Sequence, residues 1–155
     1  MIISQKNLKY ILKMERPLVF VPMAADIIHH GHINILKKSS QYGSVIVGLI
    51  TDKGLETYKG KPIIKFTNRK KIIIAIKYVD YIIPLDGLTF AEIADKLKIN
   101  FFVHGYDWKK GPQKKSRENL IKVMKKWGGK VIEIPYSKNI SSTKIKKIYD
   151  NKNKG

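Results

Sequence analysis

Short apolar runs alternate along the chain with segments of helical spacing, and this alternation constrains the fold most strongly. The runs are rich in Val, Ile and Phe and too short for helices, so we expect buried strands. They occupy residues 17–22, 45–50, 80–84, 101–104 and 131–134. Helices are expected over 4–14, 33–42, 68–78, 90–97, 113–127 and from 142 onward, and a Lys-rich loop over 53–66. This order predicts an open, mostly parallel α/β sheet.

The length of the chain fits one domain. With 155 residues, a domain buries about 68–70% of the surface that its unfolded chain exposes. We expect a helical lead-in over 1–16, the domain over 17–150 and a basic tail over 151–155. Thr67, Thr89 and Ser141 or Ser142 are expected to cap the helices that follow them.

Polar residues follow most of the predicted strands at their carboxyl ends. In chain order they are the segment His29-His30-Gly31-His32, then Asp52, then Gly105 and Asp107, and finally Ser141, Ser142 and Thr143. Because ligands of open α/β sheets bind outside the carboxyl ends of the strands, these residues are expected to gather around one site.

The turn after the first strand has the features of a phosphate site. The first N–H groups of the next helix lack partners within it, and its dipole places partial positive charge there. Gly31 has no Cβ to keep a ligand from the backbone. His29 and His32 are three residues apart and can face the same anion. A zinc site completed by Asp26 is the alternative, although two His without a further ligand make an incomplete set.

Other chemistries leave no trace in the sequence. Gly-x-Gly-x-x-Gly and the P-loop pattern are missing, which argues against a dinucleotide oxidoreductase and a P-loop enzyme. Gly-x-Ser-x-Gly is missing as well, which argues against a serine hydrolase. The chain has no cysteine, so disulfides, thiolate zinc sites and Cys nucleophiles are excluded.

The net charge of +19 allows more than one interpretation. Lys is spread over nearly the whole chain together with abundant Ile, which is typical of a biased genome composition. The alternative is a basic module that binds nucleic acid or an anionic membrane surface. No run approaches the ~20 apolar residues of a membrane span. We therefore expect a cytoplasmic protein without a transmembrane segment or a specific nucleic-acid partner.

Several motifs together resemble the cytidylyltransferase family of the His-x-Gly-His nucleotidyltransferase superfamily. The segment PMAADIIHHGHINIL carries the signature. Further matches are Thr51-Asp52, Asn68-Arg69-Lys70, Tyr78-Val79-Asp80, the segment HGYDW over 104–108 and the segment ISSTKI over 140–145. The signature alone is shared with adenylyltransferases and class I aminoacyl-tRNA synthetases, whereas the last two segments favour a cytidylyltransferase. The resemblance implies a single Rossmann-like domain.

The resemblance also implies roles for individual residues. His29, His32 and Lys61 would be catalytic groups at the reacting triphosphate, and Lys59 or Lys61 would reach the phosphates. Contacts to the nucleotide are expected from Ala24, Ala25, Gly31, Lys59, Gly105, Asp107, Ile140, Ser141, Ser142 and Thr143. Residues expected on the side of the acceptor are Asp26, Arg69, Tyr106 and Tyr136. No dedicated metal ligand is expected, because Mg²⁺ would arrive with CTP, held mainly by phosphate oxygens.

The acceptor is where this sequence departs from the glycerol-3-phosphate members of the family. Their Arg-Thr-Glu-Gly-Ile-Ser-Thr-Thr element is replaced by Tyr136-Ser-Lys-Asn-Ile-Ser-Ser-Thr. The segments VPMAAD and PYSKNISST resemble the cytidylyltransferase domains linked to phosphoenolpyruvate mutases instead, although Tyr106 replaces an Asp of those domains. The resemblance implies CMP transfer from CTP to a small phosphonate of the 2-hydroxyethyl- or 2-aminoethylphosphonate type, by a homodimer. The alternative acceptors are glycerol-3-phosphate, phosphocholine and phosphoethanolamine.

Overall fold

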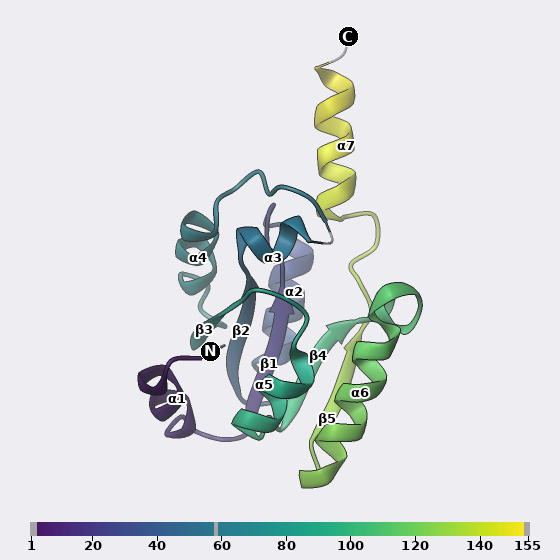
Figure 1. Ribbon diagram of the computed structural model, residues 1–155. Coiled ribbons are helices and arrows are strands. Elements are labelled where there is room, and N and C mark those ends of the chain that lie inside the picture. The colour runs from purple at the N-terminus through teal and green to yellow at the C-terminus, as the bar shows by residue number, and fades with distance from the viewer. Residues whose placement is uncertain (1–2, 58, 154–155) are drawn as a thin grey trace.

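A parallel sheet of five strands forms the centre of the protein. The computed structural model describes residues 3–57 and 59–153 (Figure 1). The strands are β1 (Leu18–Met23), β2 (Ser44–Ile50), β3 (Tyr81–Leu85), β4 (Phe101–Gly105) and β5 (Lys130–Ile134). Their order across the sheet is β3-β2-β1-β4-β5, and all neighbours are parallel. The predicted open α/β sheet is therefore confirmed.

Helices cover both faces of this sheet. They are α1 (Gln5–Leu12), α2 (His30–Ser39), α3 (Asp52–Glu56), α4 (Phe66–Ile74), α5 (Phe90–Leu97), α6 (Lys114–Met124) and α7 (Ser142–Lys152). Three short 3₁₀ turns follow β4 and α6, at Tyr106–Lys109, Gly111–Gln113 and Lys125–Trp127.

The pleat of β1 explains how two hydrophobic cores form. Leu18 and Phe20 pack in a cluster that includes apolar residues of α1, α5 and α6. Val19 and Val21 point to the other face and pack with residues of α2 and α4. All four side chains are buried, because a central strand is covered on both faces.

The chain reverses its winding between β1 and β4, and these two strands separate at their carboxyl ends. β1 pairs with β2 along its whole length, from Leu18 to Met23. With β4 it pairs only at Val19 and Phe20. Pro22 has no N–H to donate to a neighbouring strand, so the ladder does not continue there. The switch point of the sheet is thus open at the edge where ligands bind in such folds.

Three local predictions are corrected by the structure. The segment 53–66 is not all loop, since its first residues belong to α3, which Thr51 caps by accepting a hydrogen bond from the Gly54 N–H at 3.1 Å. Thr67 does not cap α4 but lies inside it, and the Phe66 N–H instead donates to Asp52 at 2.9 Å. Thr89 precedes α5 but makes no capping hydrogen bond with its side chain.

The final helix lies apart from the rest of the molecule. Figure 1 shows α7 projecting beyond the carboxyl edge of the sheet, and none of its residues is buried. It is capped by Ser141, one of the two predicted caps. It extends to Lys152, two residues into the segment predicted as a tail, and residues 154–155 lie outside the described part.

Candidate active site

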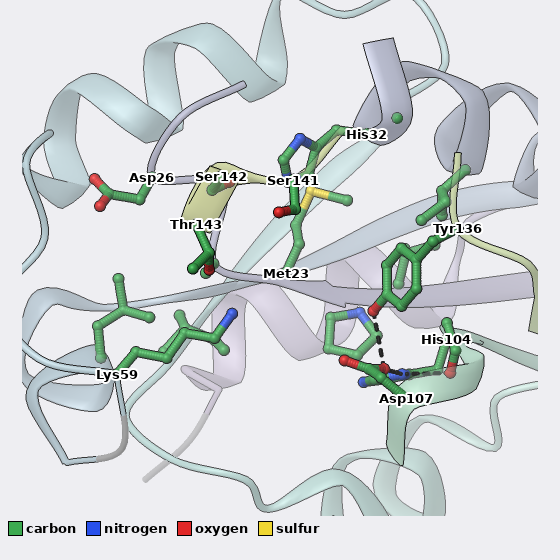
Figure 2. Close-up of a pocket in the computed structure, with 18 of the residues that line it drawn as sticks. Met23, Asp26, His32, Lys59, His104, Asp107, Tyr136, Ser141, Ser142 and Thr143 are labelled. Carbon is green, nitrogen blue, oxygen red and sulfur yellow. Dashed lines mark hydrogen bonds and ion pairs between the residues drawn. The ribbon is translucent and has the colours of Figure 1, made fainter. Parts of the chain in front are cut away.

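A pocket of about 690 Å³ opens at the carboxyl ends of β1 and β4. Its walls come from the β1–α2 turn, the segment 59–62, the start of α5, the end of β4 and the start of α7 (Figure 2). Most residues predicted for the site line it: Ala24, Asp26, His29, Gly31, His32, Lys59, Gly105, Asp107, Tyr136, Ile140, Ser141, Ser142 and Thr143. The predicted gathering is therefore observed for residues that follow β1, β4 and β5, whereas Asp52 after β2 does not line the pocket and pairs with Arg69.

The two predicted catalytic histidines are built into the start of α2. His29 is the N-cap, and its Nδ1 accepts a hydrogen bond from the Gly31 N–H at 3.1 Å. The Nδ1 of His32 accepts from the His29 N–H at 3.3 Å, which completes a reciprocal capping box. Because Nδ1 accepts in both rings, each neutral imidazole carries its proton on Nε2. Both side chains are therefore fixed as Nε2–H donors beside the pocket.

The free protein keeps these histidines neutral near pH 7. Burial lowers the pKa of His32 to about 4, and the nearby His29 and Lys59 charges act in the same direction. The pKa of His29 is also lowered, by burial and then by His30. The two rings lie 4.1 Å apart between centroids, so charging both would be unfavourable. A bound polyphosphate would favour the imidazolium form, but this effect would have to overcome both the burial and the capping bonds.

Gly31 is required for a reason that the sequence does not reveal. A Cβ at this position would lie 2.8 Å from Cε1 of the His29 ring and 2.9 Å from its Nδ1. The absence of a side chain therefore lets the His29 ring fold over the helix start and cap it. The prediction that Gly31 admits a ligand to the backbone remains a prediction.

The first turn of α7 forms a neighbouring wall of the pocket. Ser141 is the N-cap, and its hydroxyl oxygen accepts from the Lys144 N–H at 3.1 Å. The Ser142 hydroxyl donates to the Ile27 carbonyl at 3.1 Å, which ties α7 to the β1–α2 turn. Figure 2 shows Ser141, Ser142 and Thr143 grouped at the pocket. Two helix N-termini, those of α2 and α7, thus meet at one pocket, an arrangement suited to a polyphosphate.

The exit of β4 supplies a separate, aromatic part of the site. Tyr136 packs directly on Gly105, where a Cβ would lie 2.2 Å from the tyrosine ring. The Tyr136 hydroxyl donates to Asp107 Oδ1 at 2.9 Å (Figure 2). His104 has its Nδ1 3.0 Å from the Gly105 carbonyl and 3.6 Å from Asp107 Oδ1. Burial lowers the pKa of His104, so it is a neutral ring that donates from Nδ1 to the carbonyl.

A partly buried carboxylate holds this aromatic part in place. Glu133 accepts from Trp108 Nε1 at 2.9 Å and from Arg117 Nε at 2.7 Å, and it pairs with Lys109 at 2.9 Å. Burial raises the pKa of Glu133, but these three donors outweigh it and bring the pKa to about 2. Trp108 in turn stacks on His104 with 4.0 Å between ring centroids and 4° between planes.

Arg69 does not face the pocket, and its predicted place on the acceptor side is corrected. The side chain is fully buried. It donates to three backbone carbonyls, at 2.6–2.8 Å, and to a carboxylate at 2.7 Å. These acceptors are Ala24, Ile50 and Ile64 among the carbonyls, and Asp52. Arg69 therefore fastens the exits of β1 and β2 to each other.

Four other predicted residues need comment. Lys59 lines the pocket and Lys61 does not, so the structure favours Lys59 as the lysine of this loop. Tyr106 is 47% exposed and lies outside the pocket lining. Ala25 is buried with φ +52, a left-handed conformation that turns the chain between Ala24 and Asp26.

Sequence reasoning missed several residues that line the pocket. They include His104 and Lys146, together with the apolar residues Leu88 and Phe90. His104 was taken as the last residue of a strand, although its place before Gly105 at a strand exit is a usable signal. Lys146 gave none, being one of the 31 Lys and Arg residues of the chain.

No metal centre or membrane span is found in the described part. Within residues 3–57 and 59–153, no group of three or more His, Cys, Asp and Glu side chains is placed to hold a metal ion. No helix among these residues has the length and apolar character needed to cross a bilayer.

Comparisons with known proteins agree with this geometry. The model of a family described as cytidylyltransferase-like matches residues 24–148. Ethanolamine-phosphate cytidylyltransferase of Mus musculus is 38% identical over 84 residues, which cover 53% of this chain and 21% of the mouse protein. Bifunctional protein HldE of Syntrophotalea carbinolica is 29% identical over 148 residues, 91% of this chain and 29% of that protein. The chain thus spans less than a third of either relative.

Solved structures share the fold. The lipopolysaccharide core biosynthesis protein of Thermoplasma volcanium superposes with a TM-score of 0.62 at 26% identity, over 79% of this chain and 98% of that one. A pantoate-beta-alanine ligase from Francisella tularensis gives 0.60 at 21% identity, over 97% of this chain and 78% of that one, and is similar in fold alone.

Proposed function

The chain belongs to the cytidylyltransferase-like family, and on that basis we propose that it transfers CMP from CTP to a small phosphonate. The observation that carries the proposal is the meeting of two capped helix N-termini, with His29 and His32 at one and Ser141 to Thr143 at the other, around one pocket. Such a pocket supplies neutral donors to a triphosphate without supplying a nucleophile.

The chemistry is an in-line displacement. An oxygen of the phosphonate attacks the α-phosphorus of CTP, the bond from that phosphorus to the bridging oxygen breaks, and pyrophosphate leaves with the electron pair. In this proposal, the Nε2–H groups of His29 and His32 donate to the phosphate oxygens as negative charge grows on them. Catalysis then rests on positioning and on charge stabilisation by fixed donors.

Magnesium fits this pocket as a companion of the nucleotide. Asp26 and Asp107 are the carboxylates among the described lining residues, and Asp26 already accepts from two backbone N–H groups and Lys146. Mg²⁺ bound to CTP would therefore be held by phosphate oxygens and water, and it would neutralise phosphate charge. These residues offer no dedicated cage for it.

The charges of the pocket favour an acceptor without an ammonium group. Asp107 accepts from Tyr136 and lies across the pocket from Lys59, as Figure 2 shows. A buried ammonium needs an anionic partner, and among the described lining residues Asp26 is committed elsewhere. We therefore propose the hydroxyl compound, 2-hydroxyethylphosphonate, ahead of 2-aminoethylphosphonate.

Phosphoethanolamine is the second candidate acceptor. It is favoured by the 38% identity to the mouse ethanolamine-phosphate cytidylyltransferase, a protein named after this substrate. It carries an ammonium, so the two candidates differ in the group that the pocket must accommodate.

Pyrophosphate release tests the proposal. The protein is incubated with CTP, Mg²⁺ and one acceptor: 2-hydroxyethylphosphonate, 2-aminoethylphosphonate, phosphoethanolamine or glycerol-3-phosphate. We expect the highest kcat/KM with 2-hydroxyethylphosphonate. Turnover of phosphoethanolamine or glycerol-3-phosphate without turnover of either phosphonate would refute the proposed acceptor. Pyrophosphate release with ATP but not with CTP would refute the proposed nucleotide.

Neighbouring histidines provide a matched pair of variants. His29→Ala should lower kcat by about 100- to 1,000-fold, the typical loss of one donor to a developing oxyanion. His30→Ala removes an exposed imidazole one residue away that lies outside the pocket lining, and it should keep near-normal activity. Equal rates for the two variants would contradict the role of His29.

A further inference from the structure

Asp26 joins three segments that are far apart in the sequence. Its Oδ1 accepts from the Ile64 N–H at 2.9 Å, and its Oδ2 accepts from the Ile63 N–H at 3.1 Å. The same Oδ2 accepts from Lys146 Nζ at 2.5 Å. The carboxylate lies in the β1–α2 turn, the two amides in the loop that carries Lys59, and the ammonium in α7.

Burial and charge make this junction stable. Asp26 is 6% exposed. Burial raises the pKa of this carboxyl, but the Ile64 and Ile63 N–H groups and Lys146 together hold the pKa below its usual value. Asp26 is therefore an anion whose hydrogen bonds to Ile63, Ile64 and Lys146 all lie within the protein, which corrects its predicted place as a contact to the acceptor.

Helix α7 depends on this junction for its position. It has no buried residue, and it projects from the body (Figure 1). Two of its side chains, Ser142 and Lys146, are one helical turn apart and bind consecutive residues of the same turn. Ser142 donates to the Ile27 carbonyl, and Lys146 donates to Asp26. These two bonds hold the first turn of α7 against the pocket.

We propose that Asp26 and Lys146 are a positioning pair that holds the α7 phosphate-binding turn and the Lys59 loop in register across the pocket. The pair acts through these segments and contacts no reacting atom. The effect of the pair on turnover rests on the proposed function. That one ion pair fixes two walls of the pocket at once can be measured without substrate.

The coupling follows from the shared acceptor. Without Lys146, α7 keeps only the Ser142 bond to the turn, and the carboxylate loses its cationic partner. Water then replaces the ammonium group beside the Asp26 carboxylate. The hold of this carboxylate on the Ile63 and Ile64 amides weakens as a result, so both the helix and the loop become more mobile.

Hydrogen–deuterium exchange of the substrate-free protein tests the pair directly. In Lys146→Met, amides of residues 140–152 and of 59–65 should exchange about tenfold faster, the change expected when a charge-assisted hydrogen bond is lost. Amides of α5 should be unchanged and serve as an internal reference. Lys146→Arg should restore slow exchange, and Lys147→Met, an equal loss of charge at an exposed position of the same helix, should match the wild type.

Two outcomes would overturn the positioning role. If exchange in Lys146→Met is unchanged in both segments, the ion pair holds neither wall. If only α7 exchanges faster, the helix is attached by Lys146 but is not coupled to the loop. A result with Asp26→Asn serves as a second check, since it should accelerate the same two segments, and Asp26→Asn combined with Lys146→Met should add little to either.

Kinetics with CTP separate this role from a direct contact. We expect Lys146→Met to raise KM for CTP by about tenfold and to change kcat less, with recovery in Lys146→Arg. Unchanged exchange together with a raised KM would assign Lys146 to direct contact with CTP and overturn the positioning role. If no acceptor is turned over, the proposed function fails. The exchange result still decides whether Asp26 and Lys146 act as a positioning pair.

Discussion

Arg69 offers the sharpest test of how the site is held, because its predicted and observed positions imply opposite results. The variant is Arg69→Met, which keeps the length of the aliphatic stem and removes the guanidinium. A residue that contacts the acceptor would change KM and leave stability alone. A buried fastener between the exits of β1 and β2 would lower the free energy of unfolding.

The size of the loss can be worked out from the contacts. Arg69→Met leaves the carbonyls of Ala24, Ile50 and Ile64 without this donor, and each unsatisfied buried acceptor costs about 1–3 kcal/mol. The Asp52 side chain is 39% exposed, so water can solvate it and its share is small. We expect a total of about 4 kcal/mol, in the range for removing one partner of a buried pair, about 3–5 kcal/mol.

Urea denaturation followed by circular dichroism measures this loss. With a slope of roughly 2 kcal/mol per molar urea for a protein of this size, the midpoint should fall by about 2 M. Lys70→Met removes an exposed charge from the next position of α4 and is the control. If Arg69→Met unfolds at the same urea concentration as this control, the reasoning is refuted. If Arg69→Met does not fold, Arg69→Lys gives a smaller loss by the same measurement.

Three further expectations concern the pocket. His32 has a folded pKa of about 4, below the unfolded value of about 6.5, so acid favours the unfolded state. Between pH 7.5 and 5, the free energy of unfolding of the wild type should therefore fall by about 2 kcal/mol, measured by urea denaturation. His32→Asn should not show this fall. Glu133→Gln should weaken the contact that holds Trp108 and lower the free energy of unfolding. Because the pKa of Glu133 is depressed, the difference in free energy of unfolding between the wild type and this variant should narrow as pH falls from 5 to 3. Tyr136→Phe breaks one bond to Asp107 and should raise KM for CTP about fivefold at constant kcat; an unchanged KM would count against that bond.

Local patterns in the sequence were sufficient to predict the sheet and the centre of the site. Apolar runs identified all five strands, because a strand buried on both faces has no polar alternation. His29 and His32 were found because these two rings, which lie side by side at the pocket, are only three residues apart in the chain. Ser141 was recognised as a cap for the same reason, since capping is a local contact.

The residues whose roles were predicted wrongly make contacts with residues far away in the sequence. Arg69 and Asp26 were assigned to the acceptor side because the segments that contain them resemble those of the family. Their partners, Ile50 for Arg69 and Lys146 for Asp26, are 19 and 120 positions away. Nothing in a local pattern shows that a charge is already satisfied inside the protein.

Pro22 has a consequence for the energetics of ligand entry. The missing N–H that ends the β1–β4 ladder is a covalent property of the imino acid, so the gap between the strands does not depend on a bound molecule. A ligand that enters there breaks no backbone pairing and meets walls that are already separated. The cost of reorganisation on binding is consequently small, and affinity should respond to the side chains around the gap more than to the sheet itself.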